Sequence, residues 1–280
     1  MTDPKGVEVE QDVARLEPDE EEDVLKAERL SARLVYEIIR RDGTEELERP
    51  TSSLVWSGLA AGIIISFSVI AMAVLRAGLP DTPARALIET LGYSVGFVIV
   101  ILGRLQLFTE NTITTVIPLM RHPTWSNFRA VARLWGIVLA ANVTGTVFAA
   151  TFMATTAAIP PEILGAVGEI SRHMMSLSPV EMFARGVPAG ILVAAIVWML
   201  PSSGGNAFWV IVTFTWLIAA GGFTHVVAGS TEAAYVVLTG DAGLADAVFG
   251  FFLPVLAGNV VGGTLVFAML AHGQVKGEIG

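Results

Sequence analysis

Two short polar runs interrupt a largely apolar chain and hold the residues best suited to chemistry. The first is Thr109-Glu110-Asn111, directly after Phe108, and the second is Thr224-His225, directly after Phe223. A carboxylate and an imidazole are able to bind an ion or exchange a proton, since histidine titrates near neutrality. Thr and Asn side chains add hydrogen-bond donors. The two runs predict a polar solute site inside an apolar protein, although either run is also explained as a cap on broken backbone.

Two further ionisable residues flank these runs. Arg104 precedes the first run, and Glu232 follows the second. An unpaired charge at membrane depth is costly, so we expect Arg104 to pair with Glu110 or with Glu232. Such a pair would have a structural role, whereas an unpaired Arg104 would attract an anion. Weaker candidates, which would donate to a solute or satisfy backbone, are Thr112, Ser230 and Thr231.

Other kinds of chemistry find little support in the sequence. The chain has four histidines and no cysteine, and the histidines other than His225 are isolated, so neither a metal site nor a cofactor is predicted. No Ser-His-Asp or paired-carboxylate spacing indicates an enzyme. No cluster of basic residues indicates a nucleic-acid partner.

The elements that must position the polar runs are membrane helices. The chain is 53% hydrophobic and 15% charged, and its mean hydropathy is +0.65, whereas soluble domains have roughly 25% charged residues. A spanning helix needs about 20 residues. Six apolar stretches have nearly that length or more: Leu54–Leu75, Ala86–Leu107, Phe128–Thr155, Met182–Leu200, Ala207–Phe223 and Ala247–Ala271.

The polar runs lie where the second and fifth of these helices are predicted to break. A short apolar piece follows each run, Ile113–Met120 after the first and Ala233–Leu238 after the second. Neither piece is long enough to cross a bilayer alone. Each is therefore predicted to continue its span beyond a non-helical elbow, where backbone groups need new partners.

Short matches in the same order relate the two halves of the chain. The pairs are Ala61-Gly62-Ile63 with Ala189-Gly190-Ile191, Phe108-Thr109 with Phe223-Thr224, and Asn142-Val143-Thr144-Gly145 with Asn259-Val260-Val261-Gly262. Three spans in each half give the halves opposite topology, which predicts an all-α membrane protein with an inverted 3+3 repeat. On this alignment Glu110 and His225 are equivalent, and we expect both to approach one solute path.

The first 50 residues differ from the rest, with 16 of the chain's 26 acidic residues and 8 of its 17 basic residues. We interpret residues 1–50 as an acidic cytoplasmic tail and residues 51–280 as a transmembrane channel domain. Within the tail, residues 19–41 are predicted to form an amphipathic helix that Gly43 ends and that packs on the membrane domain or a neighbouring subunit. Residues 1–18 are predicted to be disordered.

The distribution of basic residues predicts the orientation. With the N-terminus inside, seven Lys and Arg residues near the helix ends face the cytoplasm and four face outward, which favours cytoplasmic N- and C-termini. The N-terminus lacks the basic-then-apolar pattern of a signal peptide. We therefore expect the first span to direct insertion into the inner (plasma) membrane.

These motifs resemble the formate/nitrite transporter family over residues 50–272. The resemblance is carried by Leu107-Phe108-Thr109, Gly222-Phe223-Thr224-His225 and Gly258-Asn259-Val260-Val261-Gly262-Gly263. The acidic tail and the Thr-Glu-Asn elbow are more similar to the YfdC-like branch. The resemblance implies an aquaporin-like protomer in a homopentamer, with one pore per protomer. It also implies that His225 is the central pore histidine, opposite Phe108-Thr109, on a route for small monovalent anions or their weak acids.

The sequence departs from better-known members at three charged positions. Those members have a small residue where Glu110 stands, no arginine where Arg104 stands and an apolar residue around Glu232, and many carry a lysine near the pore mouth that is missing here. An ionised Glu110 repels an anion unless Arg104 neutralises it. Three interpretations stay open: an anion or weak-acid pathway, a pore for a small cation or neutral solute, and a non-conducting scaffold or sensor.

Overall fold

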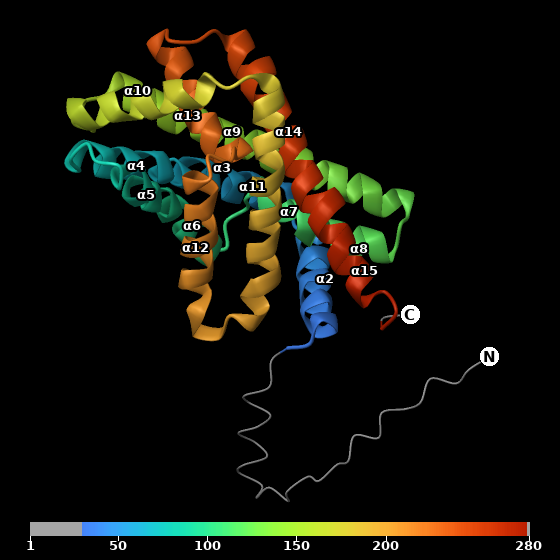
Figure 1. Ribbon diagram of the computed structural model, residues 1–280. Coiled ribbons are helices and arrows are strands. Elements are labelled where there is room, and N and C mark those ends of the chain that lie inside the picture. Colours follow the sequence, from blue (N-terminus) through green and yellow to red (C-terminus); the bar gives the residue numbers. More distant parts are fainter. Residues whose placement is uncertain (1–29, 279–280) are drawn as a thin grey trace, which may run out of the picture.

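The structure, a computed structural model that describes residues 30–278, consists of helices and their connections, with no strand in that range (Figure 1). The α-helices are α2 (Ala32–Glu48), α3 (Thr51–Ile65), α4 (Phe67–Gly78), α5 (Arg85–Glu89), α6 (Ser94–Leu102), α7 (Phe108–Thr114), α8 (Val116–Arg121), α9 (Trp125–Thr155), α10 (Pro161–Met175), α11 (Pro179–Met199), α12 (Ala207–Ala220), α13 (Val226–Thr239), α14 (Leu253–Val260) and α15 (Met269–Val275). Three short 3-10 turns, η1 (Thr90–Tyr93), η2 (Leu200–Ser202) and η3 (Gly204–Asn206), and two π-helical segments, η4 (Asp246–Phe252) and η5 (Val261–Ala268), complete them.

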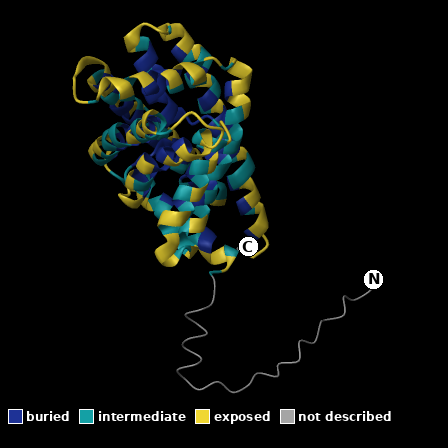
Figure 2. Cartoon of the chain, turned by 60° about the vertical axis from the view of Figure 1, so that its left-hand side comes forward, coloured by how far each residue is buried: buried dark blue, intermediate teal, exposed yellow. Residues whose placement is uncertain are grey.

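Five helical runs in the described range are long and apolar enough to cross a bilayer. They are Thr51–Gly78, Arg85–Leu102, Trp125–Thr155, Pro179–Ser202 and Asp246–Val275. The predicted fifth span, Ala207–Phe223, forms only the shorter helix α12, which ends at Ala220. Buried residues gather in the interior, and exposed ones cover much of the surface (Figure 2). Large apolar side chains such as Trp56, 72% exposed, and Leu270, 70% exposed, suit a surface solvated by lipid.

The first span is broken, although its sequence predicts one uninterrupted helix. The break falls at Ser66, between α3 and α4. The Ser66 hydroxyl donates to the Gly62 carbonyl at 3.2 Å and contacts the Thr231 hydroxyl at 2.9 Å. A serine that bonds back to its own helix competes with the helical ladder and bends it. The contact with Thr231 also links the bend to α13 by a hydrogen bond.

Glycines let the helices that carry the elbows approach one another closely. A Cβ on Gly62 of α3 would overlap the Asn142 backbone of α9, and a Cβ on Gly190 of α11 would overlap the Asn259 backbone of α14. Close approach at small residues is typical of membrane helix pairs. It brings each Asn side chain within reach of an elbow, which a larger residue at either glycine would prevent.

Helix α10 has no counterpart among the predicted elements. It begins at Pro161, a favourable first helical residue, and packs on α4 and α13. Its apolar face is buried at Ala166 and Val167. With only 15 residues and charges on its outer side, it lacks the length that identifies a spanning helix.

Helix α2 ends later than predicted. It begins after Ser31, whose hydroxyl accepts from the Leu34 N–H, and continues through Gly43 to Glu48. Gly43 is therefore inside the helix, and the predicted stop there is wrong. The part of the predicted helix before residue 30, and the predicted disordered segment 1–18, lie outside the described residues.

The docking of α2 depends on side-chain and backbone contacts along its length. The Tyr36 hydroxyl bonds His272 Nδ1 of α15 at 2.7 Å, and α2 also packs on α7 and α8. On its outer side, hydrogen bonds from Arg40 and Arg41 lower the pKa of Glu37 to about 2. That carboxylate stays ionised throughout the physiological pH range, so these ion pairs do not respond to pH there. Gly43 is buried because it lies against the Thr114 carbonyl of α7.

We predict that Gly43→Ala loosens α2. The added Cβ would overlap the Thr114 backbone, and forced overlap costs about 1–3 kcal/mol. Thermal unfolding of purified protein measures the effect as a lower melting temperature. The matched control is Gly136→Ala in α9, where an added Cβ meets nothing within 4 Å. Equal melting temperatures for the two variants would contradict the predicted contact.

Candidate solute pathway

Two elbows with the same backbone path interrupt the helices. The first elbow is residues 103–107 between α6 and α7, and the second is residues 221–225 between α12 and α13. In each, the second residue has positive φ, 51° at Arg104 and 61° at Gly222. Each ends on an extended residue, Leu107 or His225, which begins the next helix. Positive φ costs an arginine about 1 kcal/mol, whereas glycine adopts it readily.

One asparagine holds the first elbow. Asn142 Nδ2 donates to the carbonyls of Gly58 and Gln106, both at 2.8 Å, and Oδ1 accepts from the Phe108 N–H at 2.9 Å. The side chain is fully buried. Broken backbone away from water needs partners of this kind, and this amide supplies three hydrogen bonds.

A second asparagine holds the other elbow in the same way. Asn259 Nδ2 donates to the carbonyls of Gly186 at 2.8 Å and Thr224 at 2.9 Å, and Oδ1 accepts from the Val226 N–H at 2.8 Å. The Thr224 hydroxyl also donates to the Met182 carbonyl at 2.8 Å. The Thr224 hydroxyl proton is thus committed to α11 and is not available to a solute.

The matched hydrogen bonds correct the alignment of the two halves. Phe108 and Val226 are equivalent because each N–H donates to its asparagine. His225 is therefore equivalent to Leu107, and Glu110 to Ala228. The predicted equivalence of Glu110 and His225 is wrong, because it rested on the two Phe-Thr pairs, which do not occupy the same place in the elbows.

His225 and Thr109 meet at the centre of the protein. His225 Nε2 and Thr109 Oγ1 are 2.7 Å apart, and both residues are buried. His225 Nδ1 accepts from the Ala228 N–H at 3.2 Å, which leaves the ring proton on Nε2 in the neutral form. Phe97 packs edge-on against the imidazole at 5.0 Å between ring centroids. The imidazole is thus held as a hydrogen-bond donor toward Thr109.

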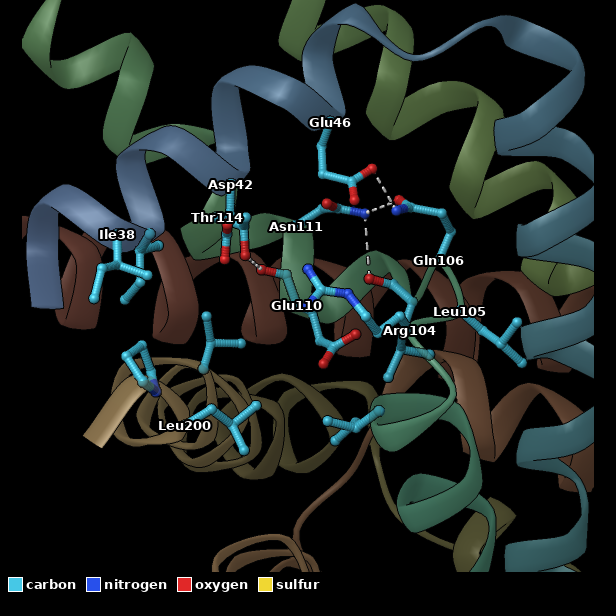
Figure 3. Close-up of a pocket in the computed structure, with 15 residues that line it drawn as sticks. Ile38, Asp42, Glu46, Arg104, Leu105, Gln106, Glu110, Asn111, Thr114 and Leu200 are labelled. Carbon is cyan, nitrogen blue, oxygen red and sulfur yellow. Dashed lines mark hydrogen bonds between the residues drawn. The ribbon is translucent and has the colours of Figure 1, made fainter. Parts of the chain in front are cut away.

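A first cavity of about 440 Å³, called here the Glu110 cavity, lies between α2 and the first elbow (Figure 3). Asp42 and Glu46 of α2 line it together with Glu110. A chain of hydrogen bonds runs along its wall. Gln106 Nε2 donates to Glu46 at 2.6 Å, and Asn111 Nδ2 donates to Gln106 Oε1 at 3.0 Å. These bonds join α2 to the elbow that it covers.

Arg104 and Glu110 face the same cavity without forming a direct ion pair. Figure 3 shows both side chains pointing into it. Within residues 30–278, Arg104 has no carboxylate within 4 Å. The predicted alternative, pairing with Glu232, is wrong because Glu232 lines a different cavity. Arg104 is positioned to offset negative charge across the cavity rather than through contact.

A second cavity of about 130 Å³, called here the Glu232 cavity, lies on the side of the second elbow. Its lining includes Tyr93, His173, Arg185, Phe223, Thr224, His225 and Glu232. Glu232 is only 8% exposed. Among the described residues it has no side-chain hydrogen bond and no ion pair, which sets it apart from the other buried acid, Glu89, which bonds Arg76 at 2.8 Å.

Neither cavity touches both Glu110 and His225, contrary to the expectation from the sequence. Leu107 lines the Glu110 cavity, and His225, its equivalent in the second elbow, lines the Glu232 cavity. Between them lies the buried contact of His225 with Thr109. Sequence reasoning missed Leu107, because the spacing from the asparagine to its bonded N–H differs by one residue between the halves, 34 from Phe108 to Asn142 and 33 from Val226 to Asn259. It also missed Glu46, whose position on α2 gave no signal.

The hydroxyl groups of Ser230 and Thr231 form hydrogen bonds within the protein. The Ser230 hydroxyl donates to the Val226 carbonyl at 2.6 Å, and Thr231 contacts Ser66. The Thr112 hydroxyl donates to the Thr109 carbonyl at 2.7 Å. These three predicted donors are therefore occupied, whereas Glu110 and Glu232 remain available to the cavities.

Comparison with known proteins identifies relatives of this chain. A family model described as Formate/nitrite transporter matches residues 33–273. The inner membrane protein YfdC of Escherichia coli (strain K12) is 43% identical over 248 residues, which cover 89% of this chain and 80% of that protein. Formate-nitrite transporter 3 of Toxoplasma gondii is 24% identical over 81% of this chain and 48% of its own length. Together they support a multi-pass protein of the inner membrane.

Two solved structures share the fold. A pentameric formate channel with formate bound has a TM-score of 0.69 and 21% identity, and the match covers 81% of this chain and 97% of that chain. An ion channel of the FNT family has a TM-score of 0.72 and 19% identity, covering 84% and 96%. At these identities the likeness concerns the helical architecture.

We predict that Asn142→Ala is among the most destabilising changes in the membrane region. It leaves the Phe108 N–H and the Gln106 carbonyl without this partner and removes an added bond to the Gly58 carbonyl of α3, and each buried unsatisfied group costs about 1–3 kcal/mol. Asn259→Ala should have the same effect at the second elbow. The control is Asn127→Ala, which removes one exposed bond to the His122 carbonyl. Melting temperatures of the purified variants are the measurement, and a tolerated Asn142→Ala would contradict the role of the amide.

Proposed function

The chain belongs to the formate/nitrite transporter family, and on that premise we propose that it is a membrane channel or transporter for a small monovalent anion or its weak acid. The route runs from the Glu110 cavity, past Leu107, Thr109 and His225, to the Glu232 cavity. Phe108, the first residue of α7, and Phe223 of the second elbow flank it.

The contact between His225 and Thr109 is the observation that carries this proposal. Both groups are buried at the point that separates the two cavities, and His225 holds a proton on Nε2. A solute that replaces Thr109 as the partner of this N–H must offer an acceptor, as an anion or a weak acid does. A cation offers none. The arrangement therefore favours acceptor solutes at the contact of His225 with Thr109.

The same hydrogen bonds support the complete architecture that we propose. Six spans in an inverted 3+3 repeat follow if α12 with its elbow crosses as the fifth span. Matched elbows, each held by one asparagine, are what such a repeat requires. In this arrangement both termini are cytoplasmic, residues 1–50 form the cytoplasmic tail, and α2 covers the cytoplasmic cavity.

We further propose a homopentamer, with one pathway in each protomer, by analogy with the pentameric formate channel whose fold is similar. Exposed apolar side chains such as Phe148 and Phe152 on α9 provide surface for lipid or for neighbouring protomers. Native mass spectrometry of detergent-purified protein should give a five-fold mass. A purely monomeric spectrum would contradict this assembly.

A second candidate function is a pore for a small cation or a neutral solute. Three carboxylates, Asp42, Glu46 and Glu110, face the Glu110 cavity with Arg104 as the facing basic group. Rings of carboxylates favour cations in channels. A non-conducting scaffold sealed by an Arg–Glu pair has less support, because Arg104 has no carboxylate within 4 Å among the described residues.

Transport by purified protein in vesicles separates these functions. With an inward gradient of sodium formate and a pH dye inside, we expect acidification faster than in protein-free vesicles, because formate enters with a proton or as formic acid. Currents across planar bilayers complete the test. A reversal potential set by the sodium or potassium gradient, without formate uptake, would establish the cation alternative and overturn the anion pathway.

A further inference from the structure

Glu232 is a buried acid whose surroundings leave its carboxyl group unoccupied. It lies in α13 with 8% of its surface exposed, and no described residue donates a hydrogen bond to it or pairs with it. Its side chain lines the cavity of about 130 Å³ that His225 also lines. An ionised carboxylate that is buried without hydrogen-bond or ion-pair partners costs much free energy. The carboxyl group therefore rests in its protonated form.

The titratable and charged groups that line the cavity with Glu232 come from four of the elements around it, while α4 and α12 contribute only the apolar residues Met72 and Ala219. The titratable and charged groups are Tyr93 of η1, His173 of α10, Arg185 of α11 and His225 at the start of α13. Arg185 is 39% exposed at its side chain and reaches the Gly222 carbonyl at 3.5 Å. It is the permanent positive charge of this lining. It attracts an anion to the cavity and offsets the charge of Glu232 when the proton leaves.

His225 is poorly placed to protonate an anion itself. Its Nδ1 already accepts the Ala228 N–H, and its Nε2 proton belongs to the neutral ring, so giving it up would leave an imidazolate. It can donate a hydrogen bond but does not release a proton. A neighbouring group must supply the proton if the solute is to pass this point as a neutral acid.

We propose that Glu232 protonates the anion in the Glu232 cavity before it reaches His225, which rests on the proposed function. The O–H bond of the Glu232 carboxyl group breaks, and a new O–H bond forms on an oxygen of the anion. The neutral acid passes His225 and Thr109 and releases its proton to water in the Glu110 cavity. Water in the Glu232 cavity then reprotonates the Glu232 carboxylate. One anion and one proton cross together.

In the corrected alignment of the halves, no acid occupies the position equivalent to Glu232. Glu232 follows its helix-starting residue by the same distance as Thr114 follows Leu107. Thr114 lines the Glu110 cavity, but its hydroxyl donates to the Glu110 carbonyl at 3.0 Å and has no acidic proton. The position equivalent to Glu232 therefore supplies no proton in the first half, where the acid nearest the elbow, Glu110, occupies a different place in its helix.

The test is Glu232→Gln in the formate uptake assay. Glutamine keeps the size and hydrogen-bonding capacity but has no proton to transfer. We expect formate-driven acidification to fall about tenfold or more and to lose its dependence on the pH of the medium. Protein-dependent uptake of formamide, which crosses without protonation, should stay within about twofold of wild type, given the near-equal size of the two side chains. The control is Glu162→Gln, an exposed acid of α10, which should transport both as wild type does.

The outcomes separate this inference from the proposed function. Wild-type protein that carries no formate would overturn the proposed function. Wild-type transport with an unchanged rate and pH profile in Glu232→Gln would overturn the inference alone. An equal loss of formate and formamide uptake would also overturn it, since that result identifies a structural role. A Glu232→Gln protein that loses a sodium or potassium current would make Glu232 a cation ligand and not a proton donor.

Discussion

The structure depends on satisfying backbone groups where helices break away from water. Two asparagine side chains do this, each with three hydrogen bonds to an elbow and to a neighbouring helix. Without them the broken ends would carry unpaired N–H and C=O groups in a low-dielectric interior. Glycines let α3 approach α9 closely, and α11 approach α14. This close approach brings the asparagine amides within hydrogen-bonding distance of the elbows.

The elbows in turn place a neutral contact between the two cavities. The side chains of His225 and Thr109 are hydrogen-bonded to each other, so neither buried polar group is left without a partner. The ionisable groups Glu110, Arg104 and Glu232 stand back from this point and face the cavities. Ionisable carboxyl and guanidinium groups therefore line the cavities, whereas the contact between His225 and Thr109 is made by neutral hydrogen-bonding groups. Such a barrier is low for a neutral molecule and high for an ion.

Much of the architecture could be predicted from the sequence. Apolar stretches of sufficient length located five spanning runs, and the polar interruptions located both breaks. The register between the halves could not be predicted from short matches, because the backbone geometry, with Leu107 equivalent to His225, depends on asparagines more than 30 residues away. Helix α10 was not predicted, and the end of α2 was predicted too early. Tertiary packing determines both features. Gly43 shows this well, because burial against Thr114 overrides its tendency to end a helix.

The positive φ of Arg104 makes the two halves unequal in their tolerance of sequence change. In the second elbow this conformation is occupied by Gly222, for which it is unstrained. In the first elbow, any side chain at position 104 strains the backbone. The backbone conformation therefore favours glycine at this position, whereas the acidic cavity favours a cation. In a relative that lacks an acid at position 110, the cavity no longer favours a cation at position 104. We therefore expect residues 104 and 110 to change together among relatives, whereas the glycine of the second elbow is favoured by the backbone alone.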